Sequence, residues 1–407
     1  MNEEAVIQLQ RLVELQELKL NALLSISTSI NQNESLGGLL KSFSFVIQEQ
    51  LNFRKYVLIA HYNHWKVFLK VGVKVKIHLE ESLEHLQRFK ELTYISESNS
   101  TLIQEFEVII PVSHGGKTVA FLLLTREQNA AGSGHDRIDF ARTLANMLCV
   151  AIENKRLAET LRAKEVINRD LETASELQKL LFPAHLPSNR KMDISAKYVA
   201  RDVIGGDYYD FIPLGDDEYI ICIADVSGKG ISAALLMANF QATLRTLFRY
   251  QRFDLSFLIE ELNKKVLSNA KGEKFITFFI AHYNAYTRKL KYINAGHNHP
   301  LLLIGKTVLP LSEGCTGLGI LDELPTLKVG KLVVPPKSTL VLYTDGVVEL
   351  ENTSGEQFSI EQLVKIVQSF SSLKMEDMNS ILFSKLDEWK GELPYGDDTA
   401  ILSCKFF

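Results

Sequence analysis

A near-continuous apolar run, Tyr219-Ile220-Ile221-Cys222-Ile223-Ala224, ends at Asp225 and is followed by the turn Val226-Ser227-Gly228-Lys229-Gly230. Such a run predicts a buried strand. The glycine-rich turn leads into a predicted helix over 231–250. The pattern therefore places a carboxylate where a buried strand meets a turn.

Three further motifs in the C-terminal half have the same character. They are Gly205-Gly206-Asp207-Tyr208-Tyr209-Asp210-Phe211, Leu340-Val341-Leu342-Tyr343-Thr344-Asp345-Gly346, and Gly396-Asp397-Asp398-Thr399-Ala400-Ile401-Leu402. If the last two strands pair antiparallel, the end of one lies beside the start of the other. Asp345 and Asp397 would then meet at one sheet edge, and the strand that ends at Asp225 could complete the cluster.

Carboxylates that lie close together repel one another and raise one another's pKa. A bound cation relieves this repulsion, so such a cluster predicts a cation site. These motifs offer oxygen ligands and no His or Cys, a donor set that favours Mg²⁺ or Mn²⁺. Two such ions roughly 3.5–4 Å apart can drive in-line attack of water at phosphorus. Each motif taken alone is typical of an ordinary turn. Their recurrence in one half of the chain favours a metal site.

The N-terminal half has a different organisation. Apolar spacing predicts a helix over 1–30, and strands around the hairpin turn 113–117 predict a small α/β domain over 31–136. Residues 137–182 contain no Gly or Pro, which predicts a long connecting helix. Its heptad positions are apolar at five of eight places between 157 and 181. The helix therefore either packs on one domain or forms a coiled coil that joins a homodimer.

Composition limits the classes of partner. The 407 residues carry 45 Lys and Arg against 49 Asp and Glu, a net charge of −4 that argues against a nucleic-acid partner. The four cysteines stand singly, as expected of reduced thiols in a cytoplasmic protein. The N-terminus does not resemble a signal peptide, and no apolar run is long enough to predict a membrane partner.

Taken in order, five motifs resemble the bacterial SpoIIE/RsbU-type branch of the PPM (type 2C) serine/threonine phosphatases. They are the Gly-Gly-Asp stretch from 205, the Asp225 stretch, Asn294-Ala295-Gly296-His297-Asn298, Tyr343-Thr344-Asp345-Gly346 and Gly396-Asp397-Asp398-Thr399-Ala400. The resemblance implies an α+β chain whose domain over 183–407 is a β-sandwich of two antiparallel sheets flanked by helices. More weakly, the layout of residues 20–155 resembles a GAF sensor domain.

The resemblance also implies a ligand set for two Mn²⁺ or Mg²⁺ ions. Asp225 would bridge both ions, Asp345 and Asp397 would hold the first, and Asp207 with the Val226 carbonyl would hold the second. Asp225 and Asp207 are thus the expected catalytic positions, with no organic cofactor.

The activity that the resemblance implies is that of a metal-dependent protein serine/threonine phosphatase. Its expected substrate is a phosphorylated STAS-type anti-sigma-factor antagonist, and an unidentified signal at the GAF-like domain would control it. One alternative is a catalytically weak pseudophosphatase that serves as a scaffold. Another is a GGDEF-like nucleotide cyclase, suggested by Gly205-Gly206-Asp207 but disfavoured because Tyr208-Tyr209 follows.

Several nearby residues receive less specific predictions. Asp398, Asp210 and Asn294 are expected to form hydrogen bonds, either to metal-bound water or within the fold. His297 is expected to be structural. Lys229 and Arg201 could contact phosphate, although solvated surface charges are the favoured interpretation, and the general acid and the phosphate clamp have no candidate.

Overall fold

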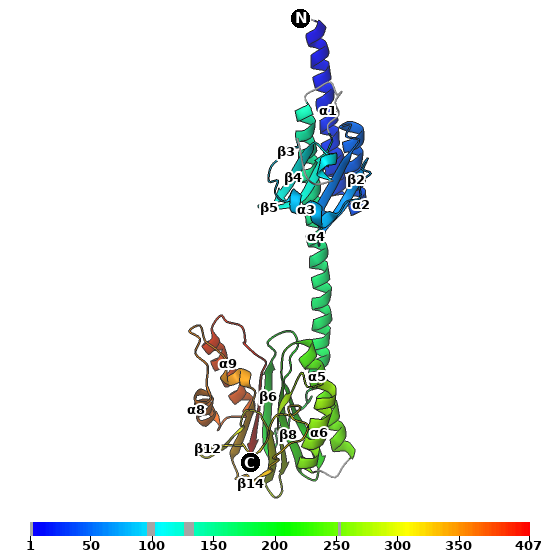
Figure 1. The fold of residues 1–407 in the computed structure, drawn as a ribbon. Coiled ribbons are helices and arrows are strands. Elements are labelled where there is room, and N and C mark those ends of the chain that lie inside the picture. Colours follow the sequence, from blue (N-terminus) through cyan, green and yellow to red (C-terminus); the bar gives the residue numbers. More distant parts are fainter. Residues whose placement is uncertain (1–2, 96–101, 126–133, 251–253) are drawn as a thin grey trace. The chain divides into compact units, whose positions relative to one another are not determined.

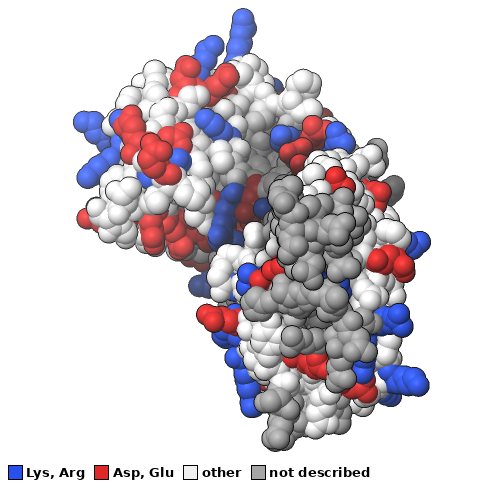
Figure 2. All heavy atoms as spheres, turned by 90° about the horizontal axis from the view of Figure 1, so that it is seen from above, with Lys and Arg blue, Asp and Glu red and all other residues white. Residues whose placement is uncertain are grey.

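The computed structural model describes residues 3–95, 102–125, 134–250 and 254–407, and Figure 1 shows its ribbon. The chain divides into two compact units, Met1–Val166 and Ile167–Phe407. Basic and acidic side chains are interspersed on the face that Figure 2 shows. Among the described residues, no helix combines the length and apolar composition needed to cross a bilayer.

The N-terminal unit is built on one antiparallel sheet with the strand order β2-β1-β5-β4-β3. The predicted turn at 113–117 closes the hairpin between β4 and β5, with Gly115 and Gly116 at positive φ. The strands are β1 (Tyr56–His61), β2 (Trp65–Val71), β3 (Thr93–Tyr94), β4 (Val108–His114) and β5 (Lys117–Leu124).

Successive side chains of a strand point to opposite sides of the sheet. Each face of this sheet packs against its own hydrophobic core. Tyr56 and Leu58 of β1 face a core shared with α1 (Glu3–Asn31), α2 (Leu36–Phe45) and the first turns of α4 (Gly134–Lys179). Val57 and Ile59 face a second core with α3 (Leu79–Leu86) and the short 3₁₀ turn Ile103–Glu105. A π-helical turn, Val46–Gln50, follows α2.

The long helix α4 covers most of the range predicted for the connector, but it begins at Gly134 and ends at Lys179. The predicted end at Phe182 is three residues too far. Residues 180–182 instead form turns, with the Phe182 amide bonded to the Lys179 carbonyl at 3.4 Å. The turn directs the Phe182 ring onto Tyr198 and Tyr209, at centroid distances of 5.3 and 4.8 Å.

The C-terminal unit contains two sheets. The first has the order β13-β10-β9-β8-β7, with β14 also paired to β10, and the second has the order β12-β11-β15-β16-β6. Pairing is antiparallel except between β10 and the two-residue strand β13. The strands are β6 (Met192–Val199), β7 (Tyr208–Gly215), β8 (Glu218–Val226), β9 (Ile276–Asn284), β10 (Lys289–Ala295), β11 (Leu301–Ile304), β12 (Thr307–Pro310), β13 (Gly314–Cys315), β14 (Gly330–Val333), β15 (Ser338–Tyr343) and β16 (Thr399–Phe406).

The two sheets pack face to face and helices cover their outer faces. Side chains such as Ile221, Phe279 and Leu402 fill the space between the sheets. The outer face of the first sheet packs on α5 (Ile231–Tyr250) and α6 (Leu255–Ala270). That of the second packs on α8 (Ile360–Phe370) and α9 (Met375–Lys390), and the one-turn helix α7 (Asp345–Val348) follows β15. The predicted sandwich of two antiparallel sheets flanked by helices is confirmed.

Candidate metal centre

The predicted pairing of the last two strands is confirmed. Strands β15 and β16 run antiparallel, with Tyr343 opposite Ile401. The Thr344 amide donates to the Ala400 carbonyl at 3.1 Å, which holds the end of β15 against the start of β16. Asp345 therefore begins a helical turn directly beside the 397–398 segment.

The other sheet brings its carboxylates to the same place. Strands β7 and β8 pair antiparallel, so that Asp207, just before β7, lies beside the end of β8 that carries Asp225. A Cβ added at Gly206 would lie only 3.1 Å from the Val226 carbonyl oxygen. The absence of a side chain at Gly206 thus lets the Asp207 loop approach that carbonyl.

The carboxylates of these segments influence one another strongly. Burial, together with the charges of Asp345, Asp397 and Asp398, raises the pKa of Asp225 to about 7. Burial, followed by the charge of Asp225, raises the pKa of Asp207 well above its ordinary value. Burial, and after it the charge of Asp397, also raises the pKa of Asp345. The two sheets thus gather negative charge from segments far apart in the sequence.

Asp207 gives the clearest sign that a cation belongs here. Its side chain is 1% exposed, and its Oδ2 atom is buried without a hydrogen-bond partner. An unpaired buried carboxylate oxygen is unfavourable unless a cation or a proton compensates it. The donors nearby are carboxylate and carbonyl oxygens, which suit Mg²⁺ or Mn²⁺.

In the described structure, the carboxylate oxygens of the acidic segments do not surround a common point. Among the described residues, no three His, Cys, Asp or Glu side chains form a group with metal-ligand geometry. Asp397 instead forms an ion pair with Lys229, whose Nζ lies 2.7 Å from its Oδ2. The 40% exposed side chain of Lys229 fits the favoured interpretation of a solvated surface charge, and the ion pair with Asp397 adds a partner that this interpretation did not include.

Asp398 acts within the fold. Its carboxylate accepts hydrogen bonds from the Arg201 amide at 2.9 Å and the Gly206 amide at 2.6 Å. It thereby fixes the loop that leads to Asp207. Arg201 contributes its backbone to this contact, and its side chain is exposed.

Gln178 and Tyr198 also contact this loop, although no local pattern in the sequence predicts either role. The Gln178 amide donates to the Gly205 carbonyl at 2.7 Å and accepts from the Gly205 amide at 3.3 Å. A Cβ at Gly205 would lie 1.9 Å from the Tyr198 hydroxyl. The last turn of α4 and the end of β6 therefore both support the Asp207 loop.

Asn294 and His297 form a turn that is held by hydrogen bonds within the fold. The Asn294 side chain accepts from the His297 amide at 2.7 Å and donates to the Leu311 carbonyl at 3.3 Å. His297 is buried and shares a hydrogen bond of 2.9 Å with Thr277. Burial lowers the pKa of His297 to about 4, so that the ring is neutral at pH 7. The predicted structural role of His297 fits this environment.

Asp210 also lies outside the cluster, in an ion pair that the sequence did not predict. Its fully buried carboxylate accepts two hydrogen bonds from Arg245 of α5, at 2.8 and 2.9 Å. It also accepts from the Phe211 amide at 2.8 Å and from the Tyr208 hydroxyl. The bidentate pair ties α5 to β7, the strand that begins directly after Asp207.

Replacing Arg245 with methionine is expected to lower the free energy of unfolding of the C-terminal unit by about 3 kcal/mol, because a buried carboxylate loses its cation. Trp65 and Trp389 are the two tryptophans, one in each unit. Urea unfolding in a Trp65→Phe background therefore reports on the C-terminal unit through Trp389. Arg245→Lys should restore part of the loss, and an unchanged midpoint for Arg245→Met would show that the pair contributes nothing.

The two-sheet sandwich has the fold of PP2C-type domains. The chain is similar in structure to the SiaA-PP2C domain of Pseudomonas aeruginosa, with a TM-score of 0.55 and 22% identity, covering 60% of this chain and 99% of that one. Residues 215–407 match the SpoIIE family, described as stage II sporulation protein E. This match covers most of the C-terminal unit, which has the sandwich fold of PP2C-type domains.

Two curated relatives extend the comparison. Protein IcfG of Synechocystis is 27% identical over 327 residues, which cover 70% of this chain and 51% of the relative. Phosphoserine phosphatase RsbU of Bacillus subtilis is 31% identical over 213 residues, which cover 51% of this chain and 62% of the relative. The chain thus spans between half and two thirds of the length of each.

Proposed function

We propose that this protein is a metal-dependent phosphatase that removes phosphate from phosphoserine or phosphothreonine in a regulatory protein. The observation that carries the proposal is that acidic segments of both sheets meet at one end of the sandwich, where Oδ2 of the buried Asp207 has no hydrogen-bond partner. The similarity to phosphoserine phosphatase RsbU supports the substrate class. The family match and the sandwich fold give no support to the cyclase alternative.

The proposed ligands are Asp207, Asp225, Asp345, Asp397 and the Val226 carbonyl, holding two Mg²⁺ or Mn²⁺ ions. Such ions would supply a water of lowered pKa and neutralise charge on the phosphoryl oxygens. Asp207 and Asp225 are the proposed catalytic positions, since both are largely buried and face this cluster. Asp398 and Gln178 hold the backbone before Asp207 in place.

Phosphate release from a phosphoserine protein tests the proposal directly. The full chain should release phosphate with Mn²⁺ and lose this activity with a chelator, because the carboxylates cannot bind phosphate unaided. A calorimetric titration with Mn²⁺ distinguishes the pseudophosphatase alternative. Metal binding without any turnover would favour the scaffold, whereas an absence of metal binding would contradict the proposed centre.

We also propose that the physiological substrate is a phosphorylated STAS-type antagonist in the cytoplasm, and that the N-terminal unit is a GAF-like sensor. The resemblance of the five motifs supports the first proposal. Four unpaired cysteines, three of them buried, support the location. The single sheet covered on both faces supports a compact regulatory domain. A ligand that raises the unfolding temperature of the N-terminal unit would be identified as its signal.

The contact between Gln178 and Gly205 offers a route by which helix α4 could order the metal site. Gln178→Ala should leave the buried amide and carbonyl of Gly205 unpaired and raise the Mn²⁺ concentration needed for half-maximal activity about tenfold. Gln241→Ala is the matched control. It removes a side-chain bond of 3.1 Å to the Leu181 carbonyl but does not touch residues 205–207. Equal metal requirements in the two variants would contradict this route.

A homodimer through α4 is the remaining part of the proposal. Leu157 (45% exposed) and Ile167 (58% exposed) occupy two heptad positions of the predicted seam, and both are exposed as they would be in a single copy of a coiled coil. Light scattering after size exclusion should give twice the mass of the chain. Ile167→Lys should shift the protein to the monomer, and a monomeric wild type would contradict the proposal.

A further inference from the structure

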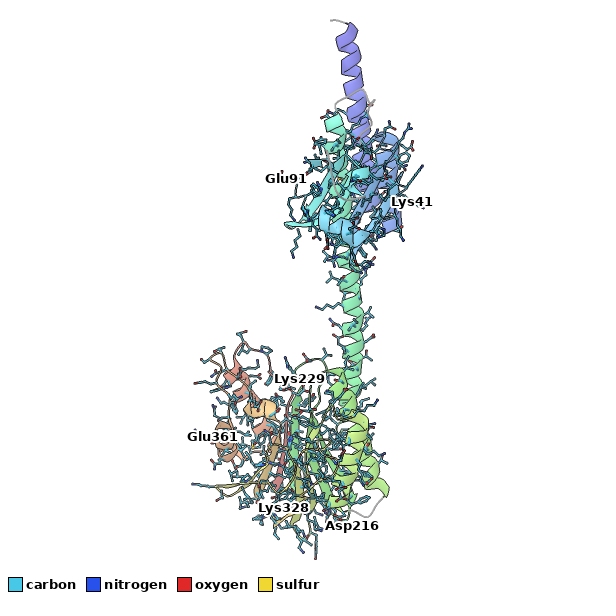
Figure 3. The ribbon with its side chains drawn as sticks, viewed as in Figure 1. Lys41, Glu91, Asp216, Lys229, Lys328 and Glu361 are labelled. Atoms are coloured by element: carbon cyan, nitrogen blue, oxygen red, sulfur yellow. The ribbon has the colours of Figure 1, made fainter. Side chains whose placement is uncertain are left out.

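Lys229 lies in direct contact with the acidic cluster. It sits in the loop after β8, and its ammonium group lies 2.7 Å from Asp397 Oδ2 and 3.2 Å from the Gly396 carbonyl. Figure 3 labels Lys229 at one end of the C-terminal unit, with Asp216 and Lys328 at the other end. Burial and Asp397 raise the pKa of Asp345, whereas Lys229 opposes that rise. The Lys229 charge thus already acts on the cluster.

The backbone that carries Lys229 is held by neighbouring hydrogen bonds, whereas its side chain is partly exposed. Gly228 and Gly230 on either side have φ values of +84° and +71°. Lys274 donates to the Ser227 carbonyl at 2.9 Å, and Ser227 accepts from the Phe275 amide at 2.8 Å. With 40% of its side chain exposed, Lys229 can reorient its ammonium group while the loop stays in place.

The charges of the site require a cation in addition to the metal ions. Five ionised carboxylates (Asp207, Asp225, Asp345, Asp397 and Asp398) and two divalent cations leave a net charge of −1. A phosphoryl dianion would be repelled by that charge, and one ammonium group brings the net charge to zero. Divalent cations that neutralise Asp397 would also weaken its attraction for Lys229.

We propose that Lys229 is the phosphate-binding residue of this site: its ammonium group leaves Asp397 and donates hydrogen bonds to the phosphoryl oxygens of the substrate. This inference rests on the proposed phosphatase function and assigns the phosphate clamp. Lysine suits this role as a compact point charge with three donors. In the absence of divalent cations, the same ammonium group partly neutralises the cluster.

The proposal predicts that Lys229→Met weakens phosphate binding but does not weaken metal binding. Inorganic phosphate should bind the Mg²⁺-loaded variant about tenfold more weakly, and KM for a phosphoserine protein should rise by a similar factor. Mg²⁺ and Mn²⁺ should bind the metal-free variant as tightly as wild type or several-fold more tightly, because the ammonium group no longer competes for Asp397. Damage to the loop would weaken both kinds of binding.

Calorimetric titrations of the full chain with metal alone, and then with phosphate, measure these effects without turnover. Lys229→Arg should restore most of the phosphate affinity. Lys191→Met is the matched control, since it removes an exposed lysine that lies 2.5 Å from Asp217, next to Asp216 at the opposite end of the unit. Its affinities should equal those of wild type.

Unchanged phosphate affinity in Lys229→Met would overturn the proposal, as would a parallel loss of metal and phosphate binding. A wild-type protein that binds Mg²⁺ and phosphate but releases no phosphate from phosphoproteins would refute the proposed function instead. The phosphate titrations of Lys229→Met and Lys229→Arg would still decide the role of Lys229 in that case.

Discussion

Asp225→Asn is expected to reduce phosphate release by a factor of about 10³ or more and to raise the unfolding temperature of the metal-free protein. The loss follows because Asp225 lies among Asp345, Asp397 and Asp398 and is the proposed bridging ligand. The gain in stability follows because the variant removes one charge from a buried cluster of like charges.

The pH dependence of this stabilisation provides a second readout. In the folded protein, burial and the neighbouring carboxylates raise the pKa of Asp225 from 3.8 to about 7. The folded state therefore binds more protons than the unfolded state between these values, and the stability that Asp225 contributes at low pH is lost as the pH rises through 7. Asp225→Asn should accordingly stabilise the metal-free protein more at pH 8 than at pH 5.

Thermal unfolding with and without Mn²⁺ at both pH values measures these effects. Wild type should gain stability on addition of Mn²⁺, whereas Asp225→Asn should gain little. Asp210→Asn is a useful comparison because it alters a buried aspartate that pairs with Arg245, outside the cluster. It should destabilise the metal-free protein. A variant Asp225→Asn that is less stable without metal than wild type would contradict the electrostatic account.

Gly346→Ala is the second substitution with a large expected effect. A Cβ at this position would lie 2.1 Å from the Asp398 carbonyl oxygen and 2.9 Å from the Thr399 hydroxyl. Because the nearer atom belongs to the backbone of the segment before β16, no side-chain rotation relieves the clash. The variant should be less stable by about 3 kcal/mol. Since Asp345 and Asp397 flank the contact, Mn²⁺ should bind at least tenfold more weakly.

Gly396→Ala is the matched control at the same edge of the sheet. A Cβ there would meet no atom within 4 Å. Stability and Mn²⁺ affinity should both stay close to those of wild type. If Gly346→Ala and Gly396→Ala had equal effects in calorimetric and urea measurements, close packing between α7 and the start of β16 would not be needed to place the two carboxylates.

Part of the site could be predicted from local pattern because strand ends and turns leave local signals. The apolar run before Asp225 predicted β8, and the glycine-rich turn predicted a helix over 231–250, which is α5. The antiparallel pairing of β15 and β16 followed from two buried-type strands that end and begin at aspartates. Successive buried side chains of β1 point to opposite faces of the sheet, so this strand likewise has a core on each face.

The end of α4 shows where local pattern was insufficient. The absence of Gly and Pro up to Phe182 predicted an uninterrupted helix, but the helix ends at Lys179. The Phe182 ring packs against Tyr198, Tyr208 and Tyr209, which come from other segments. Tertiary packing of an aromatic side chain outweighed the weak propensity of three further residues to remain helical.

By itself, the sequence determined that acidic residues stand at the ends of buried strands, because apolar runs and glycine turns are local properties of the chain. Only the tertiary structure decided that Asp210 pairs with Arg245, that Gln178 holds Gly205, and that Lys229 contacts Asp397. These contacts join residues 27 to 168 positions apart, which no periodicity records. Their partners are selected by burial, since a charge or amide removed from water requires a complementary group wherever the fold supplies one.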